Sequence, residues 1–526
     1  MPTIFQDRAG ISLFDAQYDA AGNKQAIPLQ TISQVIYATQ RFKRTCQDFS
    51  VPARNIRVLA TEATRVAKNS EEFRAAIKQN LGWDVEMLPK EEEGRVGALG
   101  VASSITGIDG LVMDLGGGSV QMTWLHNDGG AVTVGEAGSI SLPYGAAALM
   151  RRLDAAQAQG QDAVDELAAE MQTRFKQAFK QISSGSSHNL ASSEFPLFLS
   201  GGGFRGWGSV LMDTHPSSPY PIPVMNGFCV PASSFRDTSA VSLHVSTAES
   251  IFRISTRRAG QIPAVAFLIT NLTAALPAIS TVRFCQGGVR EGALFSTFSA
   301  EVRAQIPLTI ATTPFAPPSA LQALKLLQTA IPTSSSDSPS SLSPPKLVHT
   351  ILPAFANLLN HESSLPKDVR PATALRSTTT GLLAGAHGLM HEERAALSLA
   401  LCERWGGEDD LSAAEQDFFG RMSGILQPRE QWWAKFLGRI GSLVGSMWPA
   451  GVGVAGVEHE EERVRLDVRW SEGLRGVEGL VVIISAKDNV EVDAQAKKLE
   501  SLGKKKNWIG GKDGWGVKVE VAITKL

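Results

Sequence analysis

A chain of 526 residues is too long to fold around one hydrophobic core, and its length predicts three or four domains. Apolar residues make up 43% of it and charged residues 19%, which is ordinary for a soluble globular protein. The net charge of −2 argues against a partner such as nucleic acid or a membrane surface. Four scattered cysteines form no CxxC pair, so they indicate neither a disulfide framework nor a zinc site and fit a cytoplasmic location.

The first part of the chain alternates between helical and strand patterns. Apolar side chains recur on one helical face over residues 31–49, and two short strands are expected at residues 56–60 and 85–88. Acidic residues after Ser70 predict a helix start, and a further helix is expected over residues 91–104. This alternation predicts an α/β lobe, which we place at residues 1–130.

A glycine run follows these elements. Asp114-Leu115-Gly116-Gly117-Gly118-Ser119 separates an apolar stretch from an alternating one, which predicts a β-hairpin with a glycine tip. Glycines allow close approach to the backbone, so the N–H groups of the tip can wrap a phosphate, while an Asp can hold a divalent metal or a water. No Gly-Lys-Ser/Thr follows, so the run is not a Walker loop. The alternative interpretation is a tight hairpin with a capping Asp.

A second α/β lobe is predicted for residues 131–305. Residues 154–182 have the pattern of one long polar helix, and a strand at residues 195–199 leads into Ser200-Gly201-Gly202-Gly203. The apolar stretch 262–279 contains Pro263, Asn271 and Pro277, which favours a buried helix over a membrane span. Two lobes that each carry a glycine turn after a strand predict a duplicated architecture with a cleft. The alternative for the second turn is a plain strand exit.

The pattern of the remaining chain changes twice, first to helices and then to a mixture of strands and a helix. We expect a helical domain at residues 306–450, with helices over 372–390, 392–405 and 413–426 and a disordered Ser/Pro insert at 333–346. A small α+β domain is predicted at residues 460–526. Its expected elements are strands at 464–468, 480–485 and 517–521 and a helix at 490–502.

The order of several motifs resembles the exopolyphosphatase/guanosine pentaphosphate phosphohydrolase (Ppx/GppA) family. Besides the Asp114 run, these motifs are Ala60-Thr61-Glu62-Ala63-Thr64-Arg65-Val66-Ala67-Lys68-Asn69, Glu91-Glu92-Glu93-Gly94-Arg95, Ser141-Leu142-Pro143-Tyr144-Gly145, Ser200-Gly201-Gly202-Gly203 and Gly288-Val289-Arg290-Glu291-Gly292. The resemblance covers about residues 4–300. It implies the two-lobed fold of actin, sugar kinases and chaperone ATPases, which is ribonuclease H-like. The opening Phe5-Gln6-Asp7-Arg8 and Gln121 are most similar to the fungal retrograde-regulation branch.

The resemblance also implies site residues. Glu93 would position or deprotonate the attacking water, with Glu92 as the alternative by register, and Arg65 would bind phosphate. A salt bridge from Arg65 to Glu62, and a solvated helix start for the acidic run, are the alternatives. Asp114 and Gln121 would hold Mg²⁺. Phosphate contacts would come from Gly116, Gly117, Gly118 and Ser119, and a second phosphate or nucleotide would lie on the opposite lobe against Gly201, Gly202 and Gly203.

Two departures from the family pattern bear on activity. The family's loop usually ends with a carboxylate where this chain has Gln121, whose amide adds no negative charge, so metal affinity is expected to fall. The family also begins with a strand and an Asp-x-Gly-Ser-Asn phosphate loop, which does not precede Met1 in the given sequence. We interpret this as a start placed too late; the alternative is an isoform without a competent site.

Two functions remain open at this point. One is a Mg²⁺-dependent hydrolase that cleaves phosphoanhydride bonds in polyphosphate or a nucleotide polyphosphate. The alternative is a catalytically weak sensor of such ligands that regulates mitochondria-to-nucleus retrograde signalling. Signalling proteins are further expected partners, and the chain is expected to be able to form a homodimer. The nine histidines suggest no metal site. His387 and His391 are expected to have surface or packing roles.

Overall fold

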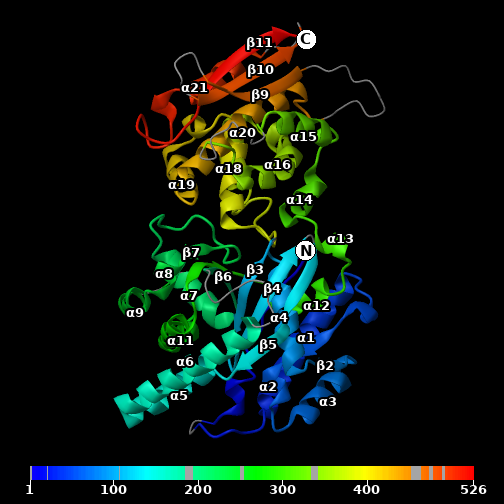
Figure 1. The fold of residues 1–526 in the computed structure, drawn as a ribbon. Helices are drawn as coiled ribbons and strands as arrows, with labels where there is room; N and C mark the ends of the chain where they lie inside the picture. Colours follow the sequence, from blue (N-terminus) through cyan, green and yellow to red (C-terminus); the bar gives the residue numbers. More distant parts are fainter. Residues whose placement is uncertain are drawn as a thin grey trace. The chain divides into compact units, whose positions relative to one another are not determined.

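The computed structural model describes residues 3–19, 22–105, 107–128, 130–183, 194–248, 251, 254–332, 342–451, 464–472, 478–487 and 492–526 (Figure 1). Contacts divide the chain into two compact units. The N-terminal unit comprises Thr3–Thr214 and Met225–Gln305, and the C-terminal unit comprises His215–Val224 and Ile306–Leu526. Most of the predicted Ser/Pro insert, residues 333–341, lies outside the described residues.

The N-terminal unit alternates strands and helices. Its strands are β1 (Val58–Ala60), β2 (Val85–Met87), β3 (Asp109–Leu115), β4 (Val120–Asp128), β5 (Ala131–Leu142), β6 (Phe195–Ser200), β7 (Cys229–Pro231) and β8 (Ile279–Phe284). Its α-helices are α1 (Leu29–Asp48), α2 (Glu62–Arg65), α3 (Ser70–Leu81), α4 (Lys90–Ala102), α5 (Ala146–Gln159), α6 (Gln161–Ser183), α7 (Gly202–Asp213), α8 (Ala232–Arg236), α9 (Thr238–Thr247), α10 (Thr256–Ala259), α11 (Ile262–Ala275), α12 (Val289–Phe295) and α13 (Ala300–Arg303).

A six-stranded sheet in the order β5-β4-β3-β6-β8-β7 is the framework of this unit. Strands β3, β6 and β8 are parallel at its centre, whereas β4, β5 and β7 join it in antiparallel pairs. Helix α4 packs against β3, β4 and β5, and α7 packs against β3, β6 and β8. The side chains of Leu111, Val112 and Met113 in β3 are therefore buried whichever face they point to, which explains the continuous apolar run. The predicted lobe boundary at residue 130 falls between β4 and β5 of this one sheet.

A second, smaller sheet consists of β1 and β2, which pair in parallel with Ala60 opposite Met87. Helices α1 and α3 pack against each other beside it. Their apolar faces form a buried cluster around Ile32, Phe73 and Ile77. The short helix α2 follows β1 almost directly. The end of this strand therefore positions Glu62 and Arg65, which are the first and last residues of α2.

Two predicted helices differ from the structure. The single helix expected over residues 154–182 is two helices, α5 and α6, because Gly160 between them has φ of +116°, outside helical geometry. In the C-terminal unit, the helix expected over residues 372–390 ends as α17 (Arg370–Arg376), and turns follow it. The buried Arg394 guanidinium donates to the carbonyls of Thr378, Leu383 and Ala386, so this side chain replaces helical hydrogen bonds.

The C-terminal unit combines helices with a three-stranded sheet in the order β11-β10-β9. Its strands are β9 (Val464–Glu472), β10 (Glu478–Ala486) and β11 (Lys518–Lys525). Its α-helices are α14 (Pro307–Thr312), α15 (Ala320–Thr329), α16 (Lys346–Leu358), α17, α18 (His391–Arg404), α19 (Ala413–Ser423), α20 (Pro428–Met447) and α21 (Asp493–Leu502). Helix α21 lies along this sheet and packs against β11 and α20 (Figure 1).

The core of the C-terminal unit is continuous from its helices to its sheet. In it, Trp432 stacks on Phe436 and contacts Trp515 edge to face. His391 is buried, and its ring nitrogens pair with the Tyr220 hydroxyl at 2.7 Å and the Val224 carbonyl at 2.9 Å. His391 therefore has the packing role expected of it. No helix in the described ranges has both the length and the apolar character to cross a membrane.

Candidate functional site: a glycine hairpin with carboxylates and arginines

The Asp114 loop is the tip of the β3–β4 hairpin, as predicted. Leu115 pairs with Val120, and the Gly116 amide donates to the Ser119 carbonyl at 3.0 Å to close the turn. The chain after Leu142 returns to the loop, where the Ala146 and Ala147 amides at the start of α5 donate to the Gly116 and Gly117 carbonyls. The predicted motif that ends at Gly145 thus holds the glycine tip in place. In the described chain, the Gly117 and Gly118 amides donate no backbone hydrogen bond of their own.

Glu62, which the sequence suggested only as a partner for Arg65, lies directly against this loop. The Ser119 hydroxyl donates to Glu62 Oε2 at 2.9 Å, and the Gln121 amide Nε2 donates to Ser119 Oγ at 2.9 Å. A Cβ atom on Gly118 would lie only 2.4 Å from Glu62 Oε2, so a residue without a side chain is needed for this approach. The loop is therefore joined to the first residue of α2 through side chains.

Arg65 pairs with Glu93 instead of Glu62. Its Nη2 donates to Glu93 Oε2 at 3.0 Å, and the side chains are 25% and 13% exposed, respectively. Its Nη1 donates to the Leu88 carbonyl, just before Pro89 and the start of α4. The end of α2 and the first turn of α4 thus bring together the two residues predicted to bind phosphate and to activate water.

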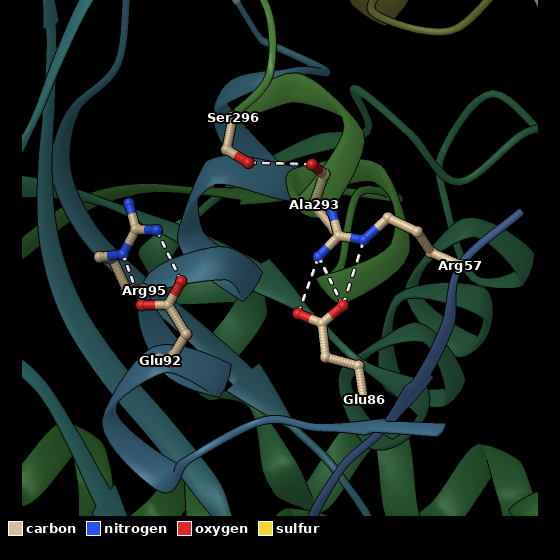
Figure 2. Close-up of polar contacts among 6 residues, drawn as sticks. All are labelled: Arg57, Glu86, Glu92, Arg95, Ala293 and Ser296. Carbon is tan, nitrogen blue, oxygen red and sulfur yellow. Dashed lines mark hydrogen bonds and ion pairs between the residues drawn. The ribbon is translucent and has the colours of Figure 1, made fainter. Parts of the chain in front are cut away.

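Glu92 and Glu93 were the two candidates for the residue that acts on the attacking water, and their environments differ. Figure 2 shows the Glu92 carboxylate paired with Arg95. Arg95 Nη2 and Glu92 Oε1 are 2.6 Å apart, and both side chains are over a third exposed. The hydrogen bond from Arg95 lowers the pKa of Glu92. Burial raises the pKa of Glu93, and the charges of Glu62 and Asp114 act in the same direction against the lowering effect of Arg65. Of the two neighbours, Glu93 is the less exposed and is the one whose pKa is raised.

Asp114 is partly buried at the end of β3, and burial raises its pKa while the positive charge of Arg205 lowers it. Its Oδ1 would be 2.4 Å from a Cβ atom on Gly201, whose φ is +92°. Both the space and the backbone conformation therefore require glycine at position 201.

The two glycine turns lie at the same edge of one sheet, which corrects their predicted placement on opposite lobes. Strands β3 and β6 are parallel neighbours with Asp114 opposite Ser200, so the turns that follow both strands must be adjacent. The second turn is the start of α7, where Gly202 is the first helical residue. The structure thus joins what the sequence suggested as two separate phosphate sites.

Arg205 is a residue that the sequence interpretation missed. It lies in the first turns of α7, and its Nε donates to the Gly201 carbonyl at 3.3 Å. Burial lowers the pKa of its guanidinium, and the positive charges of Arg8 and Arg258 act in the same direction. Its position four residues after Gly201, the residue that caps α7, was the available signal, since that spacing returns a helical side chain to the same face.

The described residues fit a cation only when phosphate or water supplies part of the ligand shell. No group of three His, Cys, Asp or Glu side chains in the described part of the chain has metal-binding geometry. Asp114 offers one carboxylate, and Gln121 directs its amide nitrogen toward Ser119, which leaves its amide oxygen as an acceptor. Mg²⁺ is commonly bound by one or two carboxylates together with substrate phosphates and water. Such shared coordination is compatible with this donor set.

Actin-like phosphate-handling proteins share this organisation. They have a mixed sheet with glycine turns at one edge, next to a carboxylate and an arginine. The model of the Ppx/GppA phosphatase family matches residues 1–301 of this chain, so the chain belongs to that family. The model of the RTG2 C-terminal domain matches residues 306–526. The resemblance inferred from the motif order is confirmed, as is the actin-like α/β fold class with a separate C-terminal part.

The chain is also similar to individual proteins and solved structures. Retrograde regulation protein 2 of Saccharomyces cerevisiae is 37% identical over 475 residues, which are 86% of this chain and 77% of that protein. The guanosine-5'-triphosphate,3'-diphosphate pyrophosphatase of Photobacterium profundum is 39% identical over 82 residues, 15% of this chain and 16% of that protein. The crystal structure of an Aquifex aeolicus Ppx/GppA phosphatase has 23% identity and a TM-score of 0.38, covering 52% of this chain and 85% of the other. An exopolyphosphatase from Cytophaga hutchinsonii has 14% identity and a TM-score of 0.40 over 52% and 85% of the two chains.

Proposed function

We propose that this protein binds linked phosphates at the Asp114 loop and hydrolyses a phosphoanhydride bond of polyphosphate or a nucleotide polyphosphate. The observation that carries this proposal is the Arg65–Glu93 ion pair, whose carboxylate interacts electrostatically with Asp114 at the loop. Hydrolysis of a phosphoanhydride needs positive charge on the phosphoryl oxygens and an oriented water. Arg65 supplies the first requirement and Glu93 the second.

Each site residue has a defined task in this proposal. The Gly117 and Gly118 amides and the Ser119 hydroxyl contact phosphoryl oxygens, while Arg65 neutralises their charge. Glu93 accepts the proton of the attacking water, a task that its raised pKa favours because a more basic carboxylate is a better proton acceptor. Gly201, Gly202 and Gly203 contact a further phosphate at the neighbouring turn.

Mg²⁺ belongs to the same proposal as a cofactor. Asp114 and the Gln121 amide oxygen are the protein atoms that would hold it, with phosphate and water completing its shell. The cation would neutralise phosphoryl charge that Arg65 alone leaves uncompensated. Gln121 contributes no charge, so we expect weak binding of the cation before phosphate is present.

The test is release of inorganic phosphate from polyphosphate, ATP and guanosine tetraphosphate, measured for the full chain and two variants. Replacing the proposed base in Glu93→Gln should reduce the rate about 100-fold or more. Glu92→Gln, which breaks only the exposed pair with Arg95, should change it less than about twofold. Equal loss in both variants, or activity that survives Glu93→Gln, would contradict the assignment of Glu93.

The second candidate is a catalytically weak sensor that takes part in retrograde signalling. The observation that favours it is the neutral Gln121 at the cation position, together with the extensive similarity to the yeast retrograde regulation protein. Nucleotide or polyphosphate binding measured by calorimetry, without phosphate release in the same samples, would support the sensor. Release that depends on Glu93 would exclude it. The C-terminal unit is then the natural place for signalling partners, and pull-down with this unit deleted or present tests that role.

A further inference from the structure

We propose that Glu62 is a specificity-determining residue of the site: its carboxylate occupies the mouth of the glycine loop as a built-in anion, which only a ligand with two or more linked phosphates displaces. The inference rests on the proposed function, because it concerns the ligand of the same loop. It assigns a task to a side chain that belongs neither to the proposed catalytic pair nor to the proposed cation ligands.

The first argument is the position of the carboxylate. A hydroxyl has one proton to donate, and Ser119 donates its proton to Glu62 Oε2 at 2.9 Å. A Cβ atom on Gly118 would lie 2.4 Å from the same oxygen and 3.0 Å from the Phe14 ring. Glu62 and Phe14 therefore cover Gly118, and the side-chain donor of the loop already serves an anion. A phosphate that enters the loop has to take this donor from Glu62.

The second argument is the charge around the loop. Glu62 and Asp114 both raise the pKa of Glu93, so each of these two carboxylates interacts with Glu93. Arg65 pairs with Glu93 and Arg205 interacts with Asp114, so a phosphate has to compete with these carboxylates for either arginine. An added orthophosphate would increase the negative charge beside Glu62 and gain a single set of contacts in return. Its binding should therefore be weak while Glu62 remains charged.

The third argument is the neighbouring turn. Because Asp114 and Ser200 are paired on adjacent parallel strands, the two glycine turns begin about 5 Å apart. A chain of linked phosphates can place one phosphoryl group in each turn and gain Arg205 as a further partner. Orthophosphate cannot make both contacts. The free-energy cost of displacing Glu62 is thus offset only when the ligand is a linked polyphosphate. The Glu62 carboxylate therefore makes the loop select linked phosphates over orthophosphate.

The test compares binding of orthophosphate, pyrophosphate and tripolyphosphate to the full chain by isothermal titration calorimetry. The informative variant is Glu62→Gln, which keeps the size of the side chain and removes its charge; Glu62→Ala is a second variant, and thermal unfolding verifies that both fold. Glu86→Gln is the matched control, because Glu86 forms an exposed ion pair with Arg57 (Figure 2). Ser119→Ala separates loop binding from the effect of Glu62.

The wild-type chain should bind tripolyphosphate and discriminate against orthophosphate, and Glu62→Gln should tighten orthophosphate binding about tenfold or more. The selectivity ratio between the two ligands should fall in both Glu62 variants and remain unchanged in Glu86→Gln. Unchanged ratios in the Glu62 variants, with weaker binding in Ser119→Ala, would overturn the role of Glu62 and leave the proposed function standing. Weaker binding in Glu62→Gln would also overturn it, since the carboxylate would then assist the ligand. Absence of binding in every variant would overturn both proposals.

Discussion

The guanidinium of Arg65 donates to the carboxylate of Glu93 at 3.0 Å, although the two residues are 28 positions apart in the chain. This contact opposes burial, which raises the pKa of Glu93, and so it sets how basic the proposed catalytic carboxylate is. The same guanidinium is the proposed phosphate ligand. Binding of phosphate would therefore draw Arg65 from Glu93 and make the carboxylate more basic at the moment when it must accept a proton.

Arg65→Ala tests this coupling. Loss of the guanidinium should weaken tripolyphosphate binding about tenfold to a hundredfold, because a charge-assisted contact to phosphate is removed. The pKa of Glu93 should rise further, since Arg65 lowers it, and the acidic limb of the activity profile should move to higher pH. Calorimetry and a pH–rate profile measure the two effects. Arg57→Ala, at an exposed ion pair with Glu86, is the control and should alter neither property.

Gly201→Ala tests the junction between the two glycine turns. The new Cβ atom would lie 2.4 Å from both Asp114 Oδ1 and the Leu115 carbonyl oxygen, and φ at this residue is +92°. We expect a loss of at least about 2 kcal/mol in the free energy of unfolding, because both the backbone conformation and the packing are incompatible with a side chain. Denaturant-induced unfolding of the full chain measures it. Gly202→Ala has open space around its Cβ position and should be nearly neutral; a comparable loss there would refute the steric explanation.

Gln121→Glu tests the cation position. The variant restores a carboxylate next to Ser119 but removes the amide donor that Ser119 Oγ accepts. Without a divalent cation, the added charge near Glu62 should lower the melting temperature, and saturating Mg²⁺ should recover it. Affinity for the cation should increase about tenfold, because a second carboxylate joins Asp114. Calorimetric titration with Mg²⁺ measures the affinity, and no gain relative to the wild-type chain would argue against Gln121 as a ligand.

Glu362→Gln tests a buried carboxylate of the C-terminal unit. Burial raises the pKa of Glu362 from its ordinary 4.5 to about 7, against the lowering effects of the Trp405 indole and Arg404. A raised pKa means that the folded chain holds this proton more tightly than the unfolded chain, so wild-type stability falls as pH rises from about 5 to 7.

The variant removes that titration. At pH 8 it should be more stable than the wild-type chain by on the order of 3 kcal/mol, and near pH 5 the difference should become small. Thermal unfolding at the two pH values measures the change. Glu408→Gln, which removes an exposed carboxylate beside Lys435, should show no such pH-dependent gain, and the idea fails if both variants behave alike.

The local elements of the site were predictable because their signals are local. An apolar run before Asp114 and an alternating run after Ser119 predict the hairpin that the structure contains. The acidic residues before Gly94 predict a helix start, and α4 begins at Lys90. The helix over residues 154–182 was wrong because Gly160 interrupts it, and periodicity alone does not distinguish a tolerated glycine from a break.

The arrangement of the glycine turns was not predictable from such signals. Strand order is decided by long-range pairing, and two turns that are far apart in the chain become neighbours only because β6 pairs with β3. Arg205 was missed for the same reason, since its effect on Asp114 depends on that pairing. The predicted domain bounds remain predictions.

By itself, the sequence determined the family, through the order of its motifs. It also supplied the residues that we propose handle phosphate: Arg65, Glu93, Asp114 and the two glycine turns. Only the tertiary structure decided how these residues are paired. In the structure, Arg65 forms an ion pair with Glu93 instead of Glu62, and Glu92 forms one with Arg95. The Glu62 carboxylate accepts a hydrogen bond from Ser119. The physical reason is that residue types are encoded locally, whereas the partner of a charge depends on which helices and strands the packed core brings together.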